Sequence, residues 1–309
     1  MQRASAAIIG IAILVLAVVF GFLLLSGRSD HPAASGSAQA SGSAAPAPSE
    51  SVAAGLTDRR WTIFYVGTDA NERRESEGES TNADALMLVS LSADQSQLTL
   101  VSLPRDTVDV PLADGGAYEG KVNSLSRERG MDALVGAMET LYGVPIDAHV
   151  ALDMDDFARL VEAAGGIEVS PETALTDPIV NLDLDVGPQM LDASQTLGYV
   201  RTRVDEDYGR MARQQEVIAA LVQRLVDPET DVDVGSLIDG LDSLETDLPL
   251  DQLGALMELA RRAGDAEVTE LVIGPPLITF EGDRDDGRGY VLEADFEAIR
   301  AEVQGFIGD

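Results

Sequence analysis

The sequence predicts an α/β protein: a single layered α-β-α domain with a central mixed sheet, preceded by one transmembrane helix. Short apolar runs rich in β-forming residues alternate with segments that have the spacing of amphipathic helices. After residue 59 there is neither an internal repeat nor a second linker, so we expect one domain over residues 59–309. Before that domain, about twenty consecutive residues are almost wholly apolar.

The N-terminal apolar run predicts a membrane anchor. Residues 4–27 carry no charge, and their apolar part has the length of a bilayer core. A cleaved signal peptide is the alternative. Its apolar core usually spans about 7–15 residues, although small residues at 33–40 leave cleavage open. We expect residues 1–28 to form a transmembrane anchor with a short cytoplasmic end. Residues 29–58, rich in Ala, Ser, Gly and Pro, are expected to be a disordered linker. The protein would then be single-pass in the cell membrane, with its C-terminal domain extracytoplasmic.

The predicted strands are short apolar runs separated by turn-forming residues. The run WTIFYV opens the domain, and ALMLVSL and LTLVSL follow it with turn-like residues between them. Their β-branched and aromatic side chains favour buried strands. In chain order, the sequence predicts strands at residues 61–66, 85–91, 98–103, 149–154, 167–170 and 268–273.

The predicted helices carry apolar residues three or four positions apart. In the first of them, Leu134 and Met138 share a face. Asp155 or Asp156 is expected to cap the second helix, and a Gly-Gly pair ends it. The longest helix stops at an Asp-Pro pair. In chain order, the sequence predicts helices at residues 131–142, 155–164, 209–226, 250–263 and 292–306.

Charge and composition argue against several classes of protein. The chain has 54 acidic and 21 basic residues, a net charge of -33, which would repel nucleic acid and anionic lipid. The absence of cysteine excludes thiol nucleophiles, disulfides and Cys-ligated zinc. The only histidines are His31 and His149, which argues against a multi-histidine metal site. Lys121 is the only lysine, either by chance or because a site requires an ammonium group.

Polar side chains gather at the ends of the predicted strands, where α/β proteins often place functional groups. Asp69 follows the first strand, Asp84 precedes the second, and Arg105 and Asp106 follow the third. Each has a purely structural alternative. The aspartates could satisfy turn amides, and Arg105 and Asp106 could form a solvated pair. The fourth segment, residues 199–215, is rich in arginine and could be a surface mesh of salt bridges.

The arginines of this fourth segment have the spacing of a phosphate-binding group. In an extended segment Arg201 and Arg203 would project to the same side. If a helix follows, Arg210 lies one turn from both Asp207 and Gln214. Planar guanidinium groups donate paired hydrogen bonds to phosphate oxygens, so three of them would surround a pyrophosphate.

Asp69 and Asp84 carry the complementary charge. Carboxylates are repelled by phosphate, but they hold Mg²⁺, which needs few protein ligands and also binds phosphate oxygens. An arginine pocket opposite a metal site of two aspartates would suit phosphoryl transfer, which depends on alignment and charge stabilisation more than on a strong nucleophile.

The order of these motifs resembles the LytR-CpsA-Psr family, whose domain is also called the cell envelope-related transcriptional attenuator domain. The resemblance extends from Trp61 to Val226. An N-terminal anchor and tether also fit that family. The motifs that carry the resemblance are GTDA, NADALMLVSL, LVSLPRD, KVNS, AAGGIEV, YVRTR and DYGRMARQQ.

The resemblance implies a role for each candidate residue. Asp69 and Asp84 match the family aspartates that bind Mg²⁺. Other positions match residues that hold the pyrophosphate of a polyprenyl lipid, whose tail enters a hydrophobic tunnel. These pyrophosphate-binding candidates are Arg105, Lys121, Arg201, Arg203, Asp207, Arg210 and Gln214.

One motif departs from the family pattern. The family usually reads Arg-Ser-Asp-Thr where this chain reads Asn-Ala-Asp-Ala, so a phosphate-contacting arginine is absent at Asn82. Arg73 or Arg74, in the polar stretch just before it, could substitute. Without a substitute, pyrophosphate affinity or turnover should be lower, or the donor should differ.

The implied activity is a Mg-dependent phosphotransferase that moves a glycan from a polyprenyl-pyrophosphate carrier to a peptidoglycan hydroxyl, with no nucleic-acid partner. Arg105 would stabilise phosphate charge, and Asp84 or Asp106 would accept the proton of the hydroxyl. Two alternatives stay open. One is a polyprenyl-pyrophosphate hydrolase that uses water in the same pocket. The other is a non-catalytic binder of the lipid carrier that regulates the envelope, which the motif at Asn82 suggests. The glycan, whether teichoic acid, capsule or another polymer, is not specified by the sequence.

Overall fold

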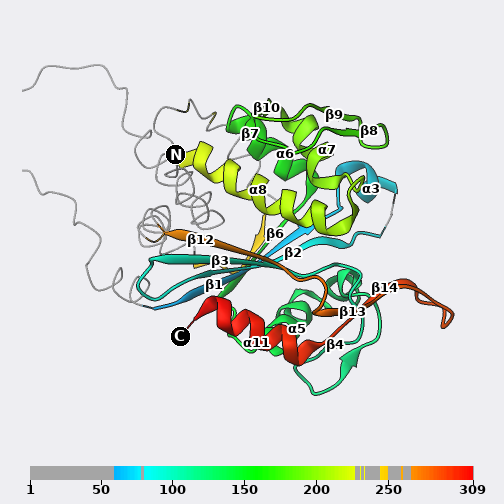
Figure 1. Cartoon of the computed structure of the whole chain (residues 1–309). Helices are drawn as coiled ribbons and strands as arrows, with labels where there is room; N and C mark the ends of the chain where they lie inside the picture. Colours follow the sequence, from blue (N-terminus) through cyan, green and yellow to red (C-terminus); the bar gives the residue numbers. More distant parts are fainter. Residues whose placement is uncertain are drawn as a thin grey trace, which may run out of the picture.

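The structure is a mixed α/β fold around a six-stranded sheet, as the sequence predicts (Figure 1). This computed structural model describes residues 59–77, 80–226, 230, 233, 244–249, 259 and 266–308. The anchor predicted at 1–28 and the linker predicted at 29–58 lie outside these residues. In the described part of the chain, no helix combines the length and hydrophobicity needed to cross a bilayer.

The central sheet contains both parallel and antiparallel pairs. β1 (Trp61–Thr68) lies in its middle, antiparallel to β2 (Ala83–Leu91) and parallel to β6 (Ala148–Leu152). On the other side of β2, β3 pairs antiparallel with β2 and parallel with β12. The sheet order is β11-β6-β1-β2-β3-β12, in which β3 spans Gln97–Ser102, β11 spans Glu245–Thr246 and β12 spans Glu267–Val272.

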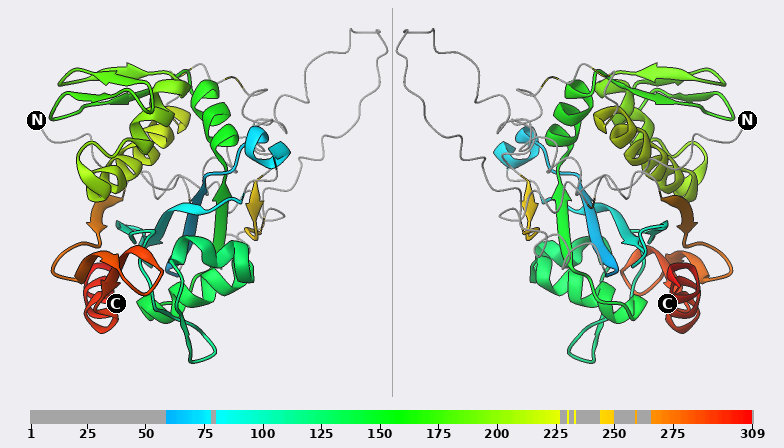
Figure 2. Two further views of the ribbon diagram at one scale, coloured as in Figure 1. Left: turned by 90° about the vertical axis from the view of Figure 1, so that its right-hand side faces the viewer. Right: turned by 90° about the vertical axis from the view of Figure 1, so that its left-hand side faces the viewer.

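Helices cover both faces of this sheet (Figures 1 and 2). Because side chains alternate along a strand, neighbouring residues of β1 enter different cores. Ile63 packs in the core under α6, α7 and α8, whereas Phe64 packs in the core with α5 and α11. One face carries α5 (Met131–Tyr142) and α11 (Phe296–Ile307), and the other carries α6 (Met154–Ala163), α7 (Ala193–Arg201) and α8 (Glu206–Val226).

Shorter elements join these layers. In Figure 2 the green paired strands at the top, β8 with β9 and β7 with β10, lie beyond the helices of one face. A separate hairpin, β13 with β14, lies near α11. The remaining elements are α3 (Glu72–Glu77), β4 (Val110–Pro111), β5 (Ala117–Tyr118), η1 (Val122–Ser124), α4 (Leu125–Arg129), β7 (Ile167–Val169), β8 (Leu175–Asp177), β9 (Leu182–Leu184), β10 (Gln189–Leu191), β13 (Ile278–Arg284) and β14 (Gly289–Ala294).

The cap of α6 differs from the prediction. Asp153 is the N-cap, and its side chain accepts a hydrogen bond from the Asp156 amide at 2.7 Å. The predicted caps, Asp155 and Asp156, instead lie in the first turn, where their negative charge suits the helix dipole. At the other end, Gly165 and Gly166 have φ of 69° and 94°, a backbone conformation that glycine adopts without a steric cost.

Two further predictions were wrong. The segment that holds Arg201 was expected to be extended, but it ends α7, which begins with a capping box of Asp192 and Gln195. The predicted helix 292–306 begins only at Phe296, because the residues before Asp295 pair as β14 with β13. The predicted helix 250–263 lies outside the described residues, apart from Leu259.

Candidate active site

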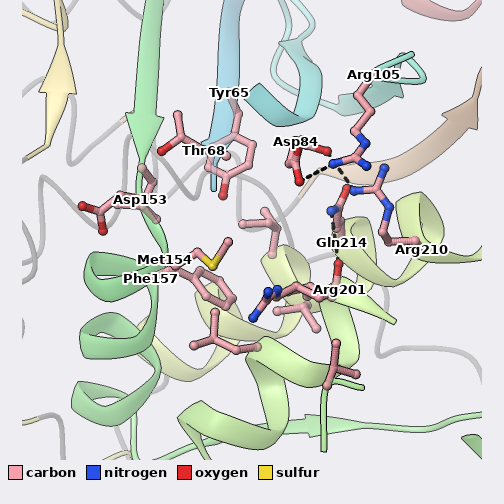
Figure 3. Close-up of a pocket in the computed structure, with 18 of the residues that line it drawn as sticks. Tyr65, Thr68, Asp84, Arg105, Asp153, Met154, Phe157, Arg201, Arg210 and Gln214 are labelled. Carbon is pink, nitrogen blue, oxygen red and sulfur yellow. Dashed lines mark hydrogen bonds and ion pairs between the residues drawn. The ribbon is translucent and has the colours of Figure 1, made fainter. Parts of the chain in front are cut away.

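A pocket of about 250 Å³ lies where β1 and β2 meet α6, α7 and α8 (Figure 3). In Figure 3, Asp84, Arg105 and Arg210 lie together at one side of it, opposite Met154 and Phe157. The polar side chains of its lining belong to Tyr65, Thr68, Asp84, Asp153, Arg105, Arg201, Arg203, Arg210 and Gln214. The apolar lining consists of Ala85, Leu152, Met154, Phe157, Val180, Leu197, Val200, Val217 and Ile218, with Gly67 beside them.

Two arginines from distant parts of the chain converge on Asp84. Arg105, just beyond β3, forms an ion pair with the Asp84 carboxylate. Arg210, in the second turn of α8, donates from Nη1 to the Asp84 carbonyl oxygen at 2.8 Å. The structure therefore places Arg105 and Arg210 side by side although they are far apart in the sequence.

Asp207 fixes the guanidinium of Arg210. Arg210 donates from Nε and Nη2 to the two carboxylate oxygens of Asp207, each at 3.0 Å, in a bidentate pair. The Arg210 residue is only 2% exposed, so its charge reaches the pocket from a rigid position. Burial opposes ionisation of Asp207, but hydrogen bonds and positive charge from Arg210, with further charge from Arg203 and Arg105, lower the pKa of this carboxyl. Asp207 is thus a stable anion that orients an arginine.

Arg203 is crowded by like charge. Its Nε lies 3.5 Å from Asp207 Oδ1. Partial burial, followed by the positive charges of Arg105 and Arg210, lowers the pKa of the Arg203 guanidinium. Arginine nonetheless stays protonated in proteins, so the pocket concentrates positive charge that an anion would neutralise.

Arg201 and Gln214 complete the polar lining. Arg201 is the last residue of α7, and its side chain extends toward Met154 and Phe157 in Figure 3. Gln214 lies one turn after Arg210 and donates from Nε2 to the Val200 carbonyl at 3.2 Å. Both residues line the pocket with Arg203, although Arg201 reaches it from a helix end rather than from the extended segment that we expected.

Arg213 has a structural role and does not line the pocket. Its guanidinium donates to the backbone carbonyls of Tyr199 and Thr202 at 2.9 and 2.6 Å and to Asp205 at 2.6 Å. It is 6% exposed and ties α7 to α8. The salt-bridge alternative therefore describes Arg213 and Asp205 well, whereas Arg201, Arg203 and Arg210 face the pocket.

Asp106 and Lys121 lie outside the pocket lining, where Asp106 contacts both Lys121 and Arg105. Lys121 Nζ is 2.8 Å from Asp106 Oδ1, and Asp106 Oδ2 is 3.6 Å from Arg105 Nε. Neither Asp106 nor Lys121 is among the residues that line the pocket. Arg105 and Asp106 lie in a turn closed by the hydrogen bond from the Thr107 amide to the Pro104 carbonyl. The contact of Asp106 with Arg105 Nε suits a role in supporting that arginine.

The two predicted metal ligands have different surroundings. Asp84 lines the pocket, and its buried Oδ1 atom accepts no hydrogen bond from the residues that the structure describes, which suits a cation. Asp69 lies outside the lining: Oδ1 accepts from the Asn82 amide at 2.6 Å, and Oδ2 pairs with Arg74 Nη1 at 2.6 Å. Among the described residues, no group of three or more acidic or histidine side chains is placed to hold a metal.

An arginine does reach Asn82, but it is neither of those we expected. Arg127, in α4, donates from Nη1 to Asn82 Oδ1 at 2.6 Å. Arg74 binds Asp69 and the Ser80 carbonyl instead, and the side chain of Arg73 lies outside the described residues. The sequence pattern missed Arg127 because it lies 45 residues further along the chain.

The family model of the LytR_cpsA_psr family matches residues 30–291, most of the chain. The chain belongs to this family. Cell wall biosynthesis protein LcpA of Corynebacterium glutamicum is 26% identical over 265 residues, which cover 76% of this chain and 51% of LcpA. The polyisoprenyl-teichoic acid–peptidoglycan teichoic acid transferase TagU of Enterococcus faecalis is 29% identical over 198 residues, 62% of this chain and 63% of TagU. The chain thus spans between half and two thirds of these two relatives.

Solved structures show that this LytR_cpsA_psr chain shares their fold. Bacillus subtilis TagV superposes with a TM-score of 0.62 at 23% identity, covering 81% of this chain and 98% of TagV. A structure of TagT bound to LIIa-WTA superposes with a TM-score of 0.63 at 20% identity, covering 82% of this chain and 93% of TagT.

Proposed function

We propose that this chain is a phosphotransferase that moves a glycan polymer from a polyprenyl-pyrophosphate carrier to a hydroxyl of peptidoglycan. The observation that carries the proposal is the convergence of Arg105, Arg201, Arg203 and Arg210 on one pocket whose remaining lining is largely apolar. The names of relatives in the same family, cell wall biosynthesis protein LcpA and teichoic acid transferase TagU, support the same reaction class. The anchor at residues 1–28 would hold the domain at the outer face of the cell membrane.

The two kinds of lining correspond to the two parts of such a donor. Guanidinium groups suit the pyrophosphate, because they donate paired hydrogen bonds and remain charged. The apolar side chains of Phe157, Leu197 and Val217 suit the first isoprene units of the lipid. A pyrophosphate attached to a hydrocarbon chain would contact both the arginines and the apolar side chains. A free nucleotide has no hydrocarbon chain to fill the apolar part of the pocket.

Asp84 is the residue best placed to hold Mg²⁺, because its Oδ1 atom is buried beside Arg105 and accepts no hydrogen bond from any described residue. When bound, Mg²⁺ would neutralise charge on phosphate oxygens. Asp69 would serve as a second ligand only after Arg74 releases its carboxylate. The chain's own contribution is mainly the alignment of four cations around the pyrophosphate.

In the proposed reaction, the acceptor hydroxyl oxygen forms a bond with the phosphorus on the sugar side of the pyrophosphate. The bond from that phosphorus to the bridging oxygen breaks, and polyprenyl phosphate leaves with the electron pair. Of the two candidate proton acceptors, Asp84 lines the pocket, whereas Asp106 pairs with Lys121 outside the lining. Asp84 would accept the proton only while it does not hold Mg²⁺, because one carboxylate cannot fill both roles at once. Arg105 and Arg210 would stabilise the charge that moves onto the leaving phosphate.

The contact between Arg127 and Asn82 bears on the non-catalytic alternative. That alternative was suggested by the missing arginine at Asn82, and a guanidinium from α4 does reach this position. Neither Asn82 nor Arg127 lines the pocket, so this contact does not decide between the transferase and the non-catalytic binder, and an activity assay is needed to separate them. The hydrolase alternative differs only in its acceptor, and an assay with and without peptidoglycan separates the two reactions.

The proposal is tested with Arg105→Ala in the full chain. Transfer of a labelled glycan from its lipid carrier to peptidoglycan should fall about 100-fold or more, because a cation at the reacting phosphate is lost. Arg224→Ala is the matched control: its side chain, at the other end of α8, donates a 3.3 Å hydrogen bond to the Ala164 carbonyl and does not line the pocket. Unchanged transfer by a folded Arg105→Ala protein would refute the proposal, and release of phosphate without transfer in the wild type would favour the hydrolase.

A further inference from the structure

The β13–β14 hairpin is fastened to the chain segment that carries Arg105. The Leu292 amide donates to the Asp106 carbonyl at 3.0 Å, and the Val108 amide donates to the Leu292 carbonyl at 3.0 Å. Arg288 adds an ion pair to Asp109 at 3.0 Å. Because these bonds hold β14 next to Asp106, the hairpin keeps a fixed position relative to the pocket.

One carboxylate on this hairpin accepts hydrogen bonds from two tyrosine hydroxyls. Tyr208, the residue after Asp207, donates to Glu281 Oε2 at 3.1 Å. Tyr290, on β14, donates to Glu281 Oε1. Glu281 is exposed, and Tyr290 is 43% exposed. The Tyr208–Glu281–Tyr290 cluster therefore joins the hairpin to the first turn of α8, and part of it faces solvent.

The cluster lies next to the two aspartates that contact the pocket arginines, because Tyr208 directly follows Asp207 and β14 is hydrogen-bonded to Asp106 through Leu292. Burial first, then the hydrogen bond and charge of Glu281, raise the pKa of the Tyr290 hydroxyl. The negative charges of Asp106 and Asp207 raise this pKa further. Asp207 holds Arg210, and Asp106 lies next to Arg105, so Tyr290 is close to both supports of the arginine pocket.

The chemistry of the cluster fits an uncharged sugar. A tyrosine ring offers a flat apolar face for the C–H side of a pyranose and a hydroxyl for hydrogen bonding, and an exposed carboxylate accepts hydrogen bonds from sugar hydroxyls. A phosphate would be repelled by Glu281. The basic side chains of the hairpin are engaged elsewhere: Arg284 pairs with Glu293, and Arg288 pairs with Asp109 and Asp286.

We propose that the Tyr208–Glu281–Tyr290 cluster binds a sugar ring of the saccharide acceptor and presents its hydroxyl to the pocket. This inference rests on the proposed function, because an acceptor site has a role only if a glycan is transferred. It assigns the two regions to the two substrates: the arginines take the charged donor, and the cluster takes the neutral acceptor. Glu281 and Tyr290 are then positioning residues for the acceptor.

The test uses the full chain in detergent, a labelled lipid-linked donor and a soluble peptidoglycan oligosaccharide as acceptor. Glu281→Gln and Tyr290→Ala should each raise the KM for the oligosaccharide about tenfold, the loss expected when a polar sugar contact is removed. The Kd of the donor, measured without acceptor, should stay unchanged. Glu293→Gln is the matched control, because Glu293 is a carboxylate of the same hairpin that pairs with Arg284 instead.

Direct binding separates this inference from the proposed function. Titration of the donor-free wild type with the oligosaccharide should show binding that Tyr290→Ala weakens. If the wild type transfers glycan but these variants keep their acceptor KM, the acceptor site is refuted and the proposed function stands. If the wild type binds the oligosaccharide without transferring glycan, the proposed function fails alone. Should Tyr290→Ala unfold, Tyr290→Phe, which keeps the ring, must still weaken binding; unchanged binding would overturn the proposal.

Discussion

The two faces of the central sheet are built for different purposes. Under α5 and α11 the core is closed and apolar, with side chains such as Phe64, Leu134 and Met138 fully buried. Under α6, α7 and α8 the core is interrupted by the pocket, where cations lie next to aliphatic residues. The first face contributes stability through burial, whereas the second retains like charges that favour binding an anion over stability.

Arg203→Ala should separate activity from stability most clearly. Glycan transfer is expected to fall about 100-fold, because a cation that faces the pyrophosphate is removed. The melting temperature should not fall, since the substitution relieves repulsion from Arg105 and Arg210, which contribute to the lowered pKa of Arg203. Transfer assays and calorimetry on the same preparation check both expectations. A large loss of stability with normal transfer would reverse the comparison.

Met138→Ala tests the closed face. Met138 is fully buried between the sheet and its helix, so its truncation should lower the free energy of unfolding by about 2–5 kcal/mol. Transfer per folded molecule should remain near the wild-type value, because the cavity forms on the face opposite the pocket. Denaturant titration measures the first quantity and a transfer assay the second. Loss of activity in fully folded protein would show that the two faces are coupled.

The pH dependence of stability gives a smaller effect. The pKa of Asp207 is lowered in the folded protein, so its ionised form contributes stability above the unfolded pKa of about 4. This contribution is lost as the pH falls through the lower folded pKa. Asp207→Asn should therefore lose less stability than the wild type between pH 5 and pH 2, a decrease that thermal unfolding at each pH reports. Identical decreases in both proteins would contradict the assigned pKa.

The sequence predicted correctly those strands and helices whose own residues form a clear apolar pattern. The runs from Trp61, Ala85 and Leu98 are strands because β-branched and aromatic side chains fill both cores. The end of α7 was missed although the capping box of Asp192 and Gln195 was present in the sequence, since Gly198 and few apolar residues hide its periodicity. The last three residues of β14, 292–294, were read as the start of a helix, because the pairing of β14 with β13 and with the segment at Asp106 is tertiary.

The pocket, too, was predicted only as far as local sequence patterns reach. Arg105, Arg201, Arg203 and Arg210 do share one lining, as their motif order suggested, because the turn after β3 and the junction between α7 and α8 meet at this pocket. Side-chain direction could not be predicted, so the sequence did not reveal that Asp106 and Lys121 pair with each other outside the pocket lining. The contact of Arg127 with Asn82 and the grouping of Tyr208, Glu281 and Tyr290 arise only from the fold.

The central claim is that the clustered guanidinium groups recognise a diphosphate attached to an isoprenoid. The most direct measurement is calorimetric titration of the full chain, with Mg²⁺ present, using farnesyl pyrophosphate and farnesyl monophosphate as short carriers. We predict that the pyrophosphate binds at least about tenfold more tightly, and that Arg203→Ala removes most of this preference. Equal affinity for the two ligands, or a preference that survives the substitution, would contradict the claim.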